Sequence, residues 1–357
     1  MDKKQKKIIV IIILILLLLG SITYLVFAVG GKRTTPNDNK KAEQKEEEKK
    51  EPDPEPVAVP TLKIIDLESK TRPIAIMIDN ESGAWPQAGL QDAYLSYEII
   101  VEGGISRILA IYKDKDTSKI GPVRSARHYY LDYALENDAI FTHFGFSPQA
   151  EGDIKRFGVN NISGTQADGG AFTRDTRIKG WQNVFTSISN LTNKATAKKY
   201  RTTSDVEPLL NYSIEEVDLN SATGATIANT IRIDYSTLYY VGYEFDIESK
   251  TYKRYMKGNP HVDRVTGAQL TYKNIIVYDI RNYPLNDGSG KGRQGLNNIG
   301  SGDGYYISNG YAIPIKWEKI SRTSGTTYRD LAGNEIKVND GNTFIHLQPQ
   351  FKTLTIK

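Results

Sequence analysis

Residues 94–112 read YLSYEIIVEGGISRILAIY and decide the fold of the first half of the chain. Two runs rich in β-branched and aromatic residues, 94–101 and 105–112, flank the short segment 102–104, which is Glu-Gly-Gly. Glycine supplies the positive φ angles that tight connections between strands need, so the stretch predicts an antiparallel hairpin. The short apolar run Pro73–Asp79 predicts a further buried strand.

Helical patterns follow the hairpin. Arg127–Leu135 has apolar residues at helical spacing, and residues 187–200 predict another helix. Ser147 followed by proline is typical of a helix start and predicts a helix that ends near Phe157. Because strands and helices are mixed without regular alternation, we predict that residues 61–215 form a layered α/β domain of the α+β class.

Helical periodicity almost disappears after about residue 225. Turn signals such as Asn309-Gly310 separate short runs with high β propensity. Residues 225–357 therefore predict a β-rich C-terminal domain, built as a meander or a small sandwich. The predicted strands are 227–233, 239–247, 251–256, 274–280, 304–308, 311–317 and 343–347.

The N-terminus predicts a membrane anchor. Residues 1–7 carry four lysines, and residues 8–29 carry no charge. As a helix, 8–29 would extend over about 33 Å, enough to cross a hydrocarbon core of about 30 Å. We predict one transmembrane helix, a basic tail in the cytoplasm and an extracytoplasmic body. A cleaved signal peptide is the alternative, although Ala28-Val29-Gly30 matches a cleavage site poorly.

Residues 30–60 predict a disordered linker. This segment has many charges of both signs, five prolines and almost no large apolar side chains. It cannot bury enough surface to offset the entropy of ordering. We expect a solvated tether, stiffened by the prolines near its end, that holds the body away from the membrane.

Composition excludes several classes of protein. The chain of 357 residues has no cysteine, so disulfides, thiolate metal sites and lipid attachment to sulfur are excluded. Its four histidines lack the common zinc-site spacings. Residues 61–357 carry 35 basic and 33 acidic residues, without the positive surplus that nucleic-acid binding requires. We expect no metal, no cofactor and no nucleic-acid partner.

Several short motifs occur in a fixed order along residues 62–350. They are RPIAIMIDN (72–80), WPQAGL (85–90), YE (97–98), EGGISR (102–107), GPVRSAR (121–127), GNPHVD (258–263), KW (316–317) and SRT (321–323). In these motifs the chain resembles the YerB-like lipoprotein family of the bacterial envelope. The resemblance covers most of residues 62–350 and implies a two-region body outside the membrane, with no agreed activity. Members of that family often carry a lipid-modified cysteine, whereas this chain would keep the implied anchor as a helix.

Two carboxylates, Glu98 and Glu102, are candidate catalytic residues. On one extended strand, four residues would separate them by about 13 Å, beyond the ~5–9.5 Å that paired glycosidase carboxylates need. A turn at Glu102 would shorten this distance, and Asp79 on another strand is a possible partner. The plainer interpretation is that both form hydrogen bonds to backbone amides or pair with Arg107.

Three arginines are the candidate ligand-binding residues. Arg107, Arg124 and Arg127 fall within 21 residues, and the latter two lie where a loop enters a predicted helix. Guanidinium groups near a helix start match phosphate or carboxylate oxygens through forked hydrogen bonds. His128, next in the chain, is a further candidate. Structural ion pairs with nearby carboxylates are the alternative.

These observations leave two functional hypotheses. We favour a membrane-anchored cell-envelope protein that binds a wall component or an envelope protein without catalysing a reaction. The alternative is an enzyme or sensor that acts on an anionic envelope substrate bearing phosphate or carboxylate. In the alternative, the three arginines hold the anion and Glu98 or Glu102 acts as acid or base.

Overall fold

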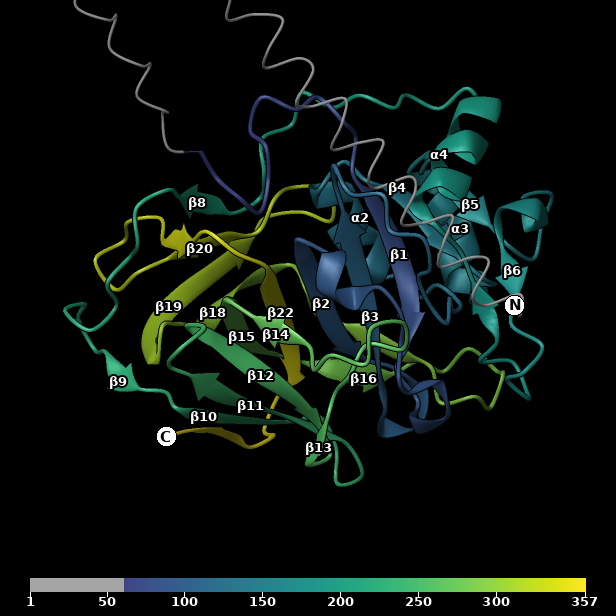
Figure 1. Cartoon of the computed structure of the whole chain (residues 1–357). Coiled ribbons are helices and arrows are strands. Elements are labelled where there is room, and N and C mark those ends of the chain that lie inside the picture. The colour runs from purple at the N-terminus through teal and green to yellow at the C-terminus, as the bar shows by residue number, and fades with distance from the viewer. Residues whose placement is uncertain (1–60) are drawn as a thin grey trace, which may run out of the picture. The chain divides into compact units, whose positions relative to one another are not determined.

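The computed structural model describes residues 61–357 (Figure 1). The predicted basic tail 1–7, transmembrane helix 8–29 and linker 30–60 lie outside the described residues. Within 61–357, no helix combines the length and the apolar character needed to cross a membrane.

The predicted hairpin is present. Strands β2 (Leu95–Ile100) and β3 (Ser106–Tyr112) pair antiparallel, with Leu95 opposite Ile111. Gly103 and Gly104 between them both have a φ of 71°, which glycine adopts without the strain that a Cβ would cause. The connection can therefore be this short because of its two glycines.

The hairpin extends into a larger sheet. Strand β1 (Ile74–Asp79) pairs antiparallel with β3, so that Asp79 lies opposite Arg107. Strand β4 (Ile140–His143) pairs parallel with β1, and β5 (Asn161–Ser163) pairs parallel with β4. The predicted strand over residues 73–79 is thus confirmed as an interior strand.

Three α-helices lie in the first half of the described residues: α2 (Tyr130–Glu136), α3 (Pro148–Arg156) and α4 (Ile188–Ala197). Ser147 caps α3, because its hydroxyl accepts a hydrogen bond from the backbone N–H of Ala150 over 3.2 Å. Ser187 caps α4 in the same way, from the N–H of Asn190 over 3.2 Å. The predicted helix starts at Ser147-Pro148 and Ser187 are confirmed.

Strands from the second half join the same sheet, which has 11 strands. Strand β22 (Thr343–Pro349) pairs parallel with β2 on one side and with β15 (Asn274–Ile280) on the other. The order is β20-β19-β18-β15-β22-β2-β3-β1-β4-β5, and β9 pairs with β19. The remaining bounds are β9 (Thr226–Ile227), β18 (Gly300–Ser308), β19 (Tyr311–Lys319) and β20 (Thr327–Arg329).

A second sheet of six strands is built from the second half of the chain. Its order is β13-β12-β11-β10-β23, with β14 also paired to β12. Its strands are β10 (Thr230–Asp234), β11 (Tyr240–Asp246), β12 (Thr251–Met256), β13 (Asn259–Pro260), β14 (Thr271–Tyr272) and β23 (Leu354–Ile356). Three two-stranded ribbons are β6 (Thr173–Arg174) with β7 (Val184–Phe185), β8 (Asn211–Ser213) with β21 (Lys337–Asn339), and β16 (Asn282–Pro284) with β17 (Gln294–Leu296).

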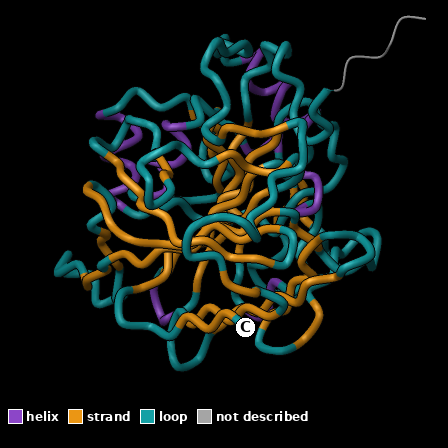
Figure 2. The backbone as a smooth tube through the Cα atoms, turned by 90° about the vertical axis from the view of Figure 1, so that its left-hand side faces the viewer, coloured by secondary structure: helices purple, strands orange, loops and turns teal. Residues whose placement is uncertain are grey.

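Side chains alternate between two hydrophobic cores, one on each face of the large sheet. In β1, Ala75 and Met77 pack in the core that includes Tyr130 of α2. Ile76 and Ile78 pack in the other core, with side chains of the second sheet and of α4. The large sheet is therefore the middle layer, and Figure 2 shows strands through the centre with helices toward the periphery.

The predicted α+β class, with helices only in the first half, agrees with the structure of residues 61–357. Residues 225–357 are rich in strands, as predicted, but their strands do not form only a meander or a small sandwich. Several of them complete the sheet that the first half begins, and residues 61–357 lie in one compact unit. The domain limits at residues 215 and 225 stay a prediction.

Candidate functional site

The candidate site lies at one edge of the large sheet. Strands β1, β2 and β4 run in the same direction, so their carboxyl ends meet at that edge, where β3 begins. Asp79 ends β1 directly opposite Arg107 near the start of β3. The edge formed by the carboxyl ends of parallel strands is where ligands bind in open α/β sheets.

Arg107, Arg124 and Arg127 meet two carboxylates at this edge, and we call these five residues the arginine cluster. The Nε of Arg124 lies 3.0 Å from Oδ2 of Asp79, and the Nε of Arg127 lies 2.6 Å from Oε1 of Glu102. Arg107 donates from Nη1 to the carbonyl oxygen of Ser125 over 2.5 Å. Three positive and two negative charges leave the cluster with a surplus of one positive charge.

Four polar atoms of the cluster are buried without a hydrogen-bond partner in the structure. They are Oδ2 of Asp79, Oε2 of Glu102, Nε of Arg107 and Nε of Arg124. Oδ2 of Asp79 and Nε of Arg124 face each other in the ion pair, so the unused groups are Oε2 of Glu102 and Nε of Arg107. Among the three arginines of the cluster, Arg107 is the most enclosed, since its residue is only 5% exposed. Buried donors without partners are rare in native proteins, because each costs about 1–3 kcal/mol. The cluster therefore has hydrogen-bonding capacity that the protein itself does not use.

Electrostatics at Arg107 favour an added anion. Burial, and after it the positive charge of Arg127, lower the pKa of Arg107 to about 10. A lowered arginine pKa means that the surroundings disfavour its positive charge. A bound phosphate or carboxylate would offset both causes, because it adds negative charge and accepts the unused N–H.

Trp181 borders the cluster. The guanidinium of Arg124 lies 5.7 Å from the centre of the Trp181 ring, within the range of a cation–π contact. Trp181 is 65% exposed, so most of its indole faces solvent. An aromatic side chain beside charged donors presents an apolar surface at the rim of the candidate site.

The two candidate carboxylates lie in different surroundings. Glu102 belongs to the arginine cluster. Burial alone would raise its pKa, but the hydrogen bond and the charge of Arg127 outweigh burial and lower it overall. Glu98 is fully buried and faces the second sheet, where Ser106, Tyr239 and Arg254 bind its carboxylate. The structure therefore does not bring Glu98 to the arginines.

Glu98 is the centre of a buried polar network that the sequence analysis missed. Oε2 of Glu98 accepts from Nη2 of Arg254 over 2.7 Å, and Oε1 accepts from Tyr239 over 2.7 Å. The members of this buried network, which are joined by hydrogen bonds, are Asn80, Gln87, Glu98, Ser106, Tyr235, Tyr239, Tyr243, Arg254, His261 and His346. One signal was available. Tyr252, Arg254 and Met256 occupy every second position of β12, and this spacing places all three on the same, buried face.

His128 lines a cavity beside the cluster rather than joining the arginines. The cavity has a volume of 380 Å³ and includes Asp132 of α2, Asn298 and Arg322. Burial lowers the pKa of His128, and the charge of Arg322 lowers it further, so the imidazole is neutral at pH 7.

His143, which the sequence analysis placed in the core, is buried and hydrogen-bonded to the carbonyl oxygen of Gly145.

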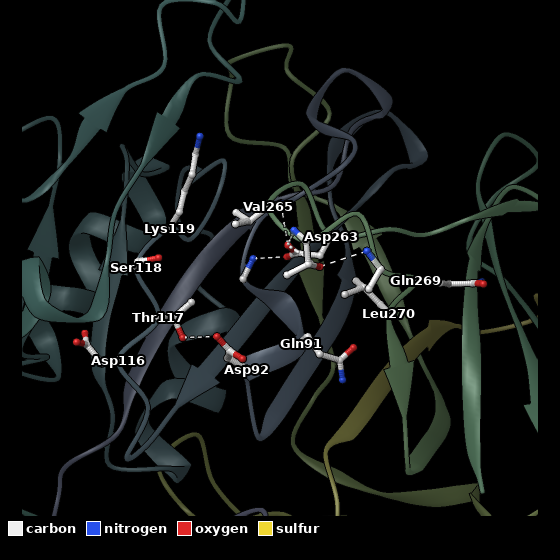
Figure 3. A pocket seen from close by; sticks show the side chains of 13 residues that line it. Gln91, Asp92, Asp116, Thr117, Ser118, Lys119, Asp263, Val265, Gln269 and Leu270 are labelled. Atoms are coloured by element: carbon white, nitrogen blue, oxygen red, sulfur yellow. Dashed lines mark hydrogen bonds between the residues drawn. The ribbon is translucent and has the colours of Figure 1, made fainter. Parts of the chain in front are cut away.

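Another cavity, of 390 Å³, lies between segments 89–92, 116–119 and 263–270 (Figure 3). Its buried carboxylate, Asp263, already accepts hydrogen bonds from the backbone N–H groups of Gly89, Val265 and Thr266. Asp92 in the same wall accepts from the hydroxyl of Thr117 over 2.8 Å. These groups serve turns and loop contacts, so we place the candidate site at the arginine cluster. Within residues 61–357, no group of three or more His, Asp or Glu side chains could hold a metal ion.

Comparison with known proteins gives consistent matches. Residues 61–201 match the N-terminal domain, and residues 231–345 the C-terminal domain, of a protein of unknown function (DUF3048). The protein named Putative lipoprotein YerB, from Bacillus subtilis (strain 168), is 28% identical over 298 residues, which cover 83% of this chain and 86% of that protein. The crystal structure of the YerB protein from Bacillus subtilis matches with a TM-score of 0.72 and 25% identity, over 84% of this chain and 99% of that one.

Fold and comparisons together define a two-domain α+β protein in which both domains contribute to one mixed sheet. The chain belongs to the YerB-like family of proteins of unknown function (DUF3048). The resemblance noted from the sequence motifs is thereby confirmed.

Proposed function

We propose that the protein is a noncatalytic component of the cell envelope, anchored by residues 8–29, whose arginine cluster binds an anionic group of a wall component. The observation that carries this proposal is the buried Nε of Arg107, which has no acceptor in the structure. A phosphate or carboxylate oxygen placed there would accept from Arg107, while Arg124 and Arg127 add positive charge to the same cluster.

The envelope location rests on two supports. The similar Bacillus subtilis protein is named a lipoprotein, which is a membrane-attached class. This chain has no cysteine to carry a lipid, while its uncharged residues 8–29 follow four lysines. A membrane helix would take the place of the lipid, with the lysines in the cytoplasm.

Binding without catalysis agrees with the pairing of the carboxylates. Asp79 and Glu102 each contact an arginine within 3.0 Å. The lowered pKa of Glu102 keeps it ionised at neutral pH, so it cannot donate a proton as a general acid. An enzyme that acts on an anionic substrate remains the second candidate, because Oε2 of Glu102 is free to act as a base.

The test measures thermal stabilisation of the full-length protein by two probes, glycerol-phosphate oligomers and a muramyl peptide that carries carboxylates. An uncharged polyoxyethylene detergent avoids competing phosphate or sugar head groups. We expect at least one probe to raise the melting temperature of the wild type, because ligands that bind only the folded state stabilise it. The two probes distinguish a phosphate from a carboxylate ligand.

Two variants make the test specific. Arg124→Lys keeps the charge but loses the forked geometry, so the melting temperature without probe should be unchanged and the probe-induced shift should be lost. Arg232→Lys is the matched control, since the Nε of Arg232 also contacts a carboxylate, Oδ1 of Asp234, at a distance of 2.8 Å. This pair does not belong to the arginine cluster. A drop in stability of Arg124→Lys without probe, with an intact shift, would make Arg124 a structural ion-pair partner and overturn the proposal.

A further inference from the structure

The cavity lined by His128 is built from both halves of the chain. Its walls come from the start of α2, from the ribbon of β16 and β17 with the residues that follow it, and from the loop of Arg322. Its volume of 380 Å³ falls in the range of about 300–1,000 Å³ that small-molecule pockets occupy. We call it the His128 cavity.

One wall of the His128 cavity is fixed by charged groups that already have partners. Arg322 donates from Nε to Asp132 over 2.8 Å, from Nη1 to Asp153 over 2.7 Å and from Nη2 to the carbonyl oxygen of His128 over 3.0 Å. Asn298 donates to the other oxygen of Asp132 over 2.7 Å. This wall is therefore rigid, and the guanidinium has its three nitrogens engaged.

Other groups of the cavity are free. Within residues 61–357, the side chains of His128, Tyr283 and Asn297 form no hydrogen bond to the protein. Asn297 is exposed, and Tyr283 is 39% exposed. The neutral imidazole offers one donor and one acceptor, and the Asn297 amide and the Tyr283 hydroxyl each offer both. The cavity thus presents both hydrogen-bond donors and hydrogen-bond acceptors to a ligand.

The ring of Tyr283 lies flat on its neighbouring strand. Tyr283 is opposite Gly295 across the ribbon, and a Cβ at Gly295 would lie 2.5 Å from the ring. Glycine at this position therefore lets the ring approach the neighbouring strand, and Tyr283 as a residue is still 39% exposed. A half-exposed aromatic face beside polar groups suits a ligand that has both an apolar face and hydroxyls.

Charge argues against an anion in this cavity. The carboxylate of Asp132 is part of the wall, and the nitrogens of Arg322 already donate to protein oxygens. An anion would meet Asp132 without a free charged donor to offset the repulsion. The ligand that fits is neutral, rich in hydroxyls and able to lie on an aromatic ring.

We propose that the His128 cavity binds a neutral sugar residue, whose face packs on Tyr283 and whose hydroxyls bond to His128 and Asn297. This site is distinct from the arginine cluster, although Arg127 and His128 are adjacent in the chain. The two sites together would hold a glycan that carries an anionic group near a neutral sugar.

The test is saturation-transfer NMR on the full-length protein, in a polyoxyethylene detergent without sugar head groups. The probes are the trimer of N-acetylglucosamine and maltotriose, which separate amide-bearing from plain sugars. We expect transfer to at least one of them at millimolar concentration. Asn297→Ala should weaken the affinity by about 10-fold, the effect of losing one or two hydrogen bonds.

A control variant separates the outcomes. Asn220→Ala removes an exposed amide elsewhere and should leave the transfer unchanged. Neither sugar carries a charge, so failure of the arginine cluster as an anion site does not affect this result. Absence of transfer to both sugars would overturn the sugar proposal. Equal transfer with the wild type and Asn297→Ala would overturn it as well.

Discussion

Arg254 donates from Nη2 to Oε2 of Glu98 over 2.7 Å, and neither side chain is exposed to solvent. The two residues are 156 positions apart, one in β12 of the second sheet and one in β2 of the large sheet. The pair therefore connects the two sheets and the two halves of the chain. Tyr239 also donates to the Glu98 carboxylate, and Arg254 also donates to Tyr243 and His261, so both charges have the further partners that a buried ion pair requires.

Removing one charge of this pair should destabilise the fold strongly. Glu98→Gln leaves the Arg254 guanidinium buried without its counter-charge, and we expect the free energy of unfolding to fall by about 3–5 kcal/mol. Chemical denaturation followed by tyrosine and tryptophan fluorescence measures this loss. Asp303→Asn is the control, because the Asp303–Lys316 pair is largely exposed and its loss should leave the midpoint nearly unchanged.

A double variant tests whether the loss comes from an uncompensated charge. Glu98→Gln combined with Arg254→Met should recover part of the stability, since no buried charge then lacks a partner. If Glu98→Gln alone behaves like the exposed control, the buried network does not hold the two sheets together.

Acid should destabilise the protein through His143. Nδ1 of His143 donates to the carbonyl oxygen of Gly145 over 2.8 Å, and Nε2 accepts from Asn161 over 3.2 Å. Burial lowers its pKa from 6.5 to about 4. The unfolded chain therefore takes up a proton at a higher pH than the folded chain, so stability is complete above pH 6.5 and falls as the pH drops toward 4.

The size of this effect can be measured by comparing two proteins. Between pH 7 and pH 5, the His143 term should lower the free energy of unfolding by about 2 kcal/mol. His143→Gln should lose less stability than the wild type over the same interval, whatever its absolute stability, because the other titrating groups are common to both. Parallel pH profiles for the two proteins would show that His143 does not titrate as proposed.

The anchor prediction is open to direct measurement in cells. We expect the full-length chain in the membrane fraction and the body accessible to protease added from outside, because four lysines precede the uncharged residues 8–29. N-terminal sequencing identifies the species present. A soluble form that begins near Gly30 would show that the segment is a cleaved signal.

The body should fold without its first 60 residues. Residues 61–357 lie in one compact unit, and both cores described there are built from side chains within it. We expect a chain that starts at Thr61 to melt at the same temperature as the full-length protein. Aggregation or an unfolded spectrum for the shorter chain would mean that residues 1–60 contribute to the core.

Local structure could be predicted from the sequence, because short-range patterns encode it. The glycines of the hairpin and the caps at Ser147 and Ser187 act within a few residues of one another. The insertion of β22 between β15 and β2 could not be predicted in this way. The pairing of β22 with β2 joins segments roughly 250 residues apart. The sequence of residues 343–347 predicts a strand, but it does not indicate which other strand lies beside it.

The candidate site was predicted in the same partial way. Clustering along the chain brought Arg107, Arg124 and Arg127 together, and the structure places all three near the ends of β1 and β3. Glu102 lies in the arginine cluster and Glu98 in the buried network. This difference depends on the position of each residue in the sheet and on what packs against it. Glu98 contacts Arg254 only because the second sheet covers that face, and this contact joins residues 156 positions apart in the sequence.

The most direct test of the account is the ¹⁵Nε–¹H resonance of Arg107, measured while glycerol-phosphate oligomer or the muramyl peptide is added to the full-length protein. If the arginine cluster binds an anion, the Nε–H of Arg107 gains an acceptor. Its resonance should then shift downfield and exchange more slowly with water, with saturation at the concentration that stabilises the fold. An Arg107 resonance that stays unchanged with both probes at stabilising concentrations would contradict the account.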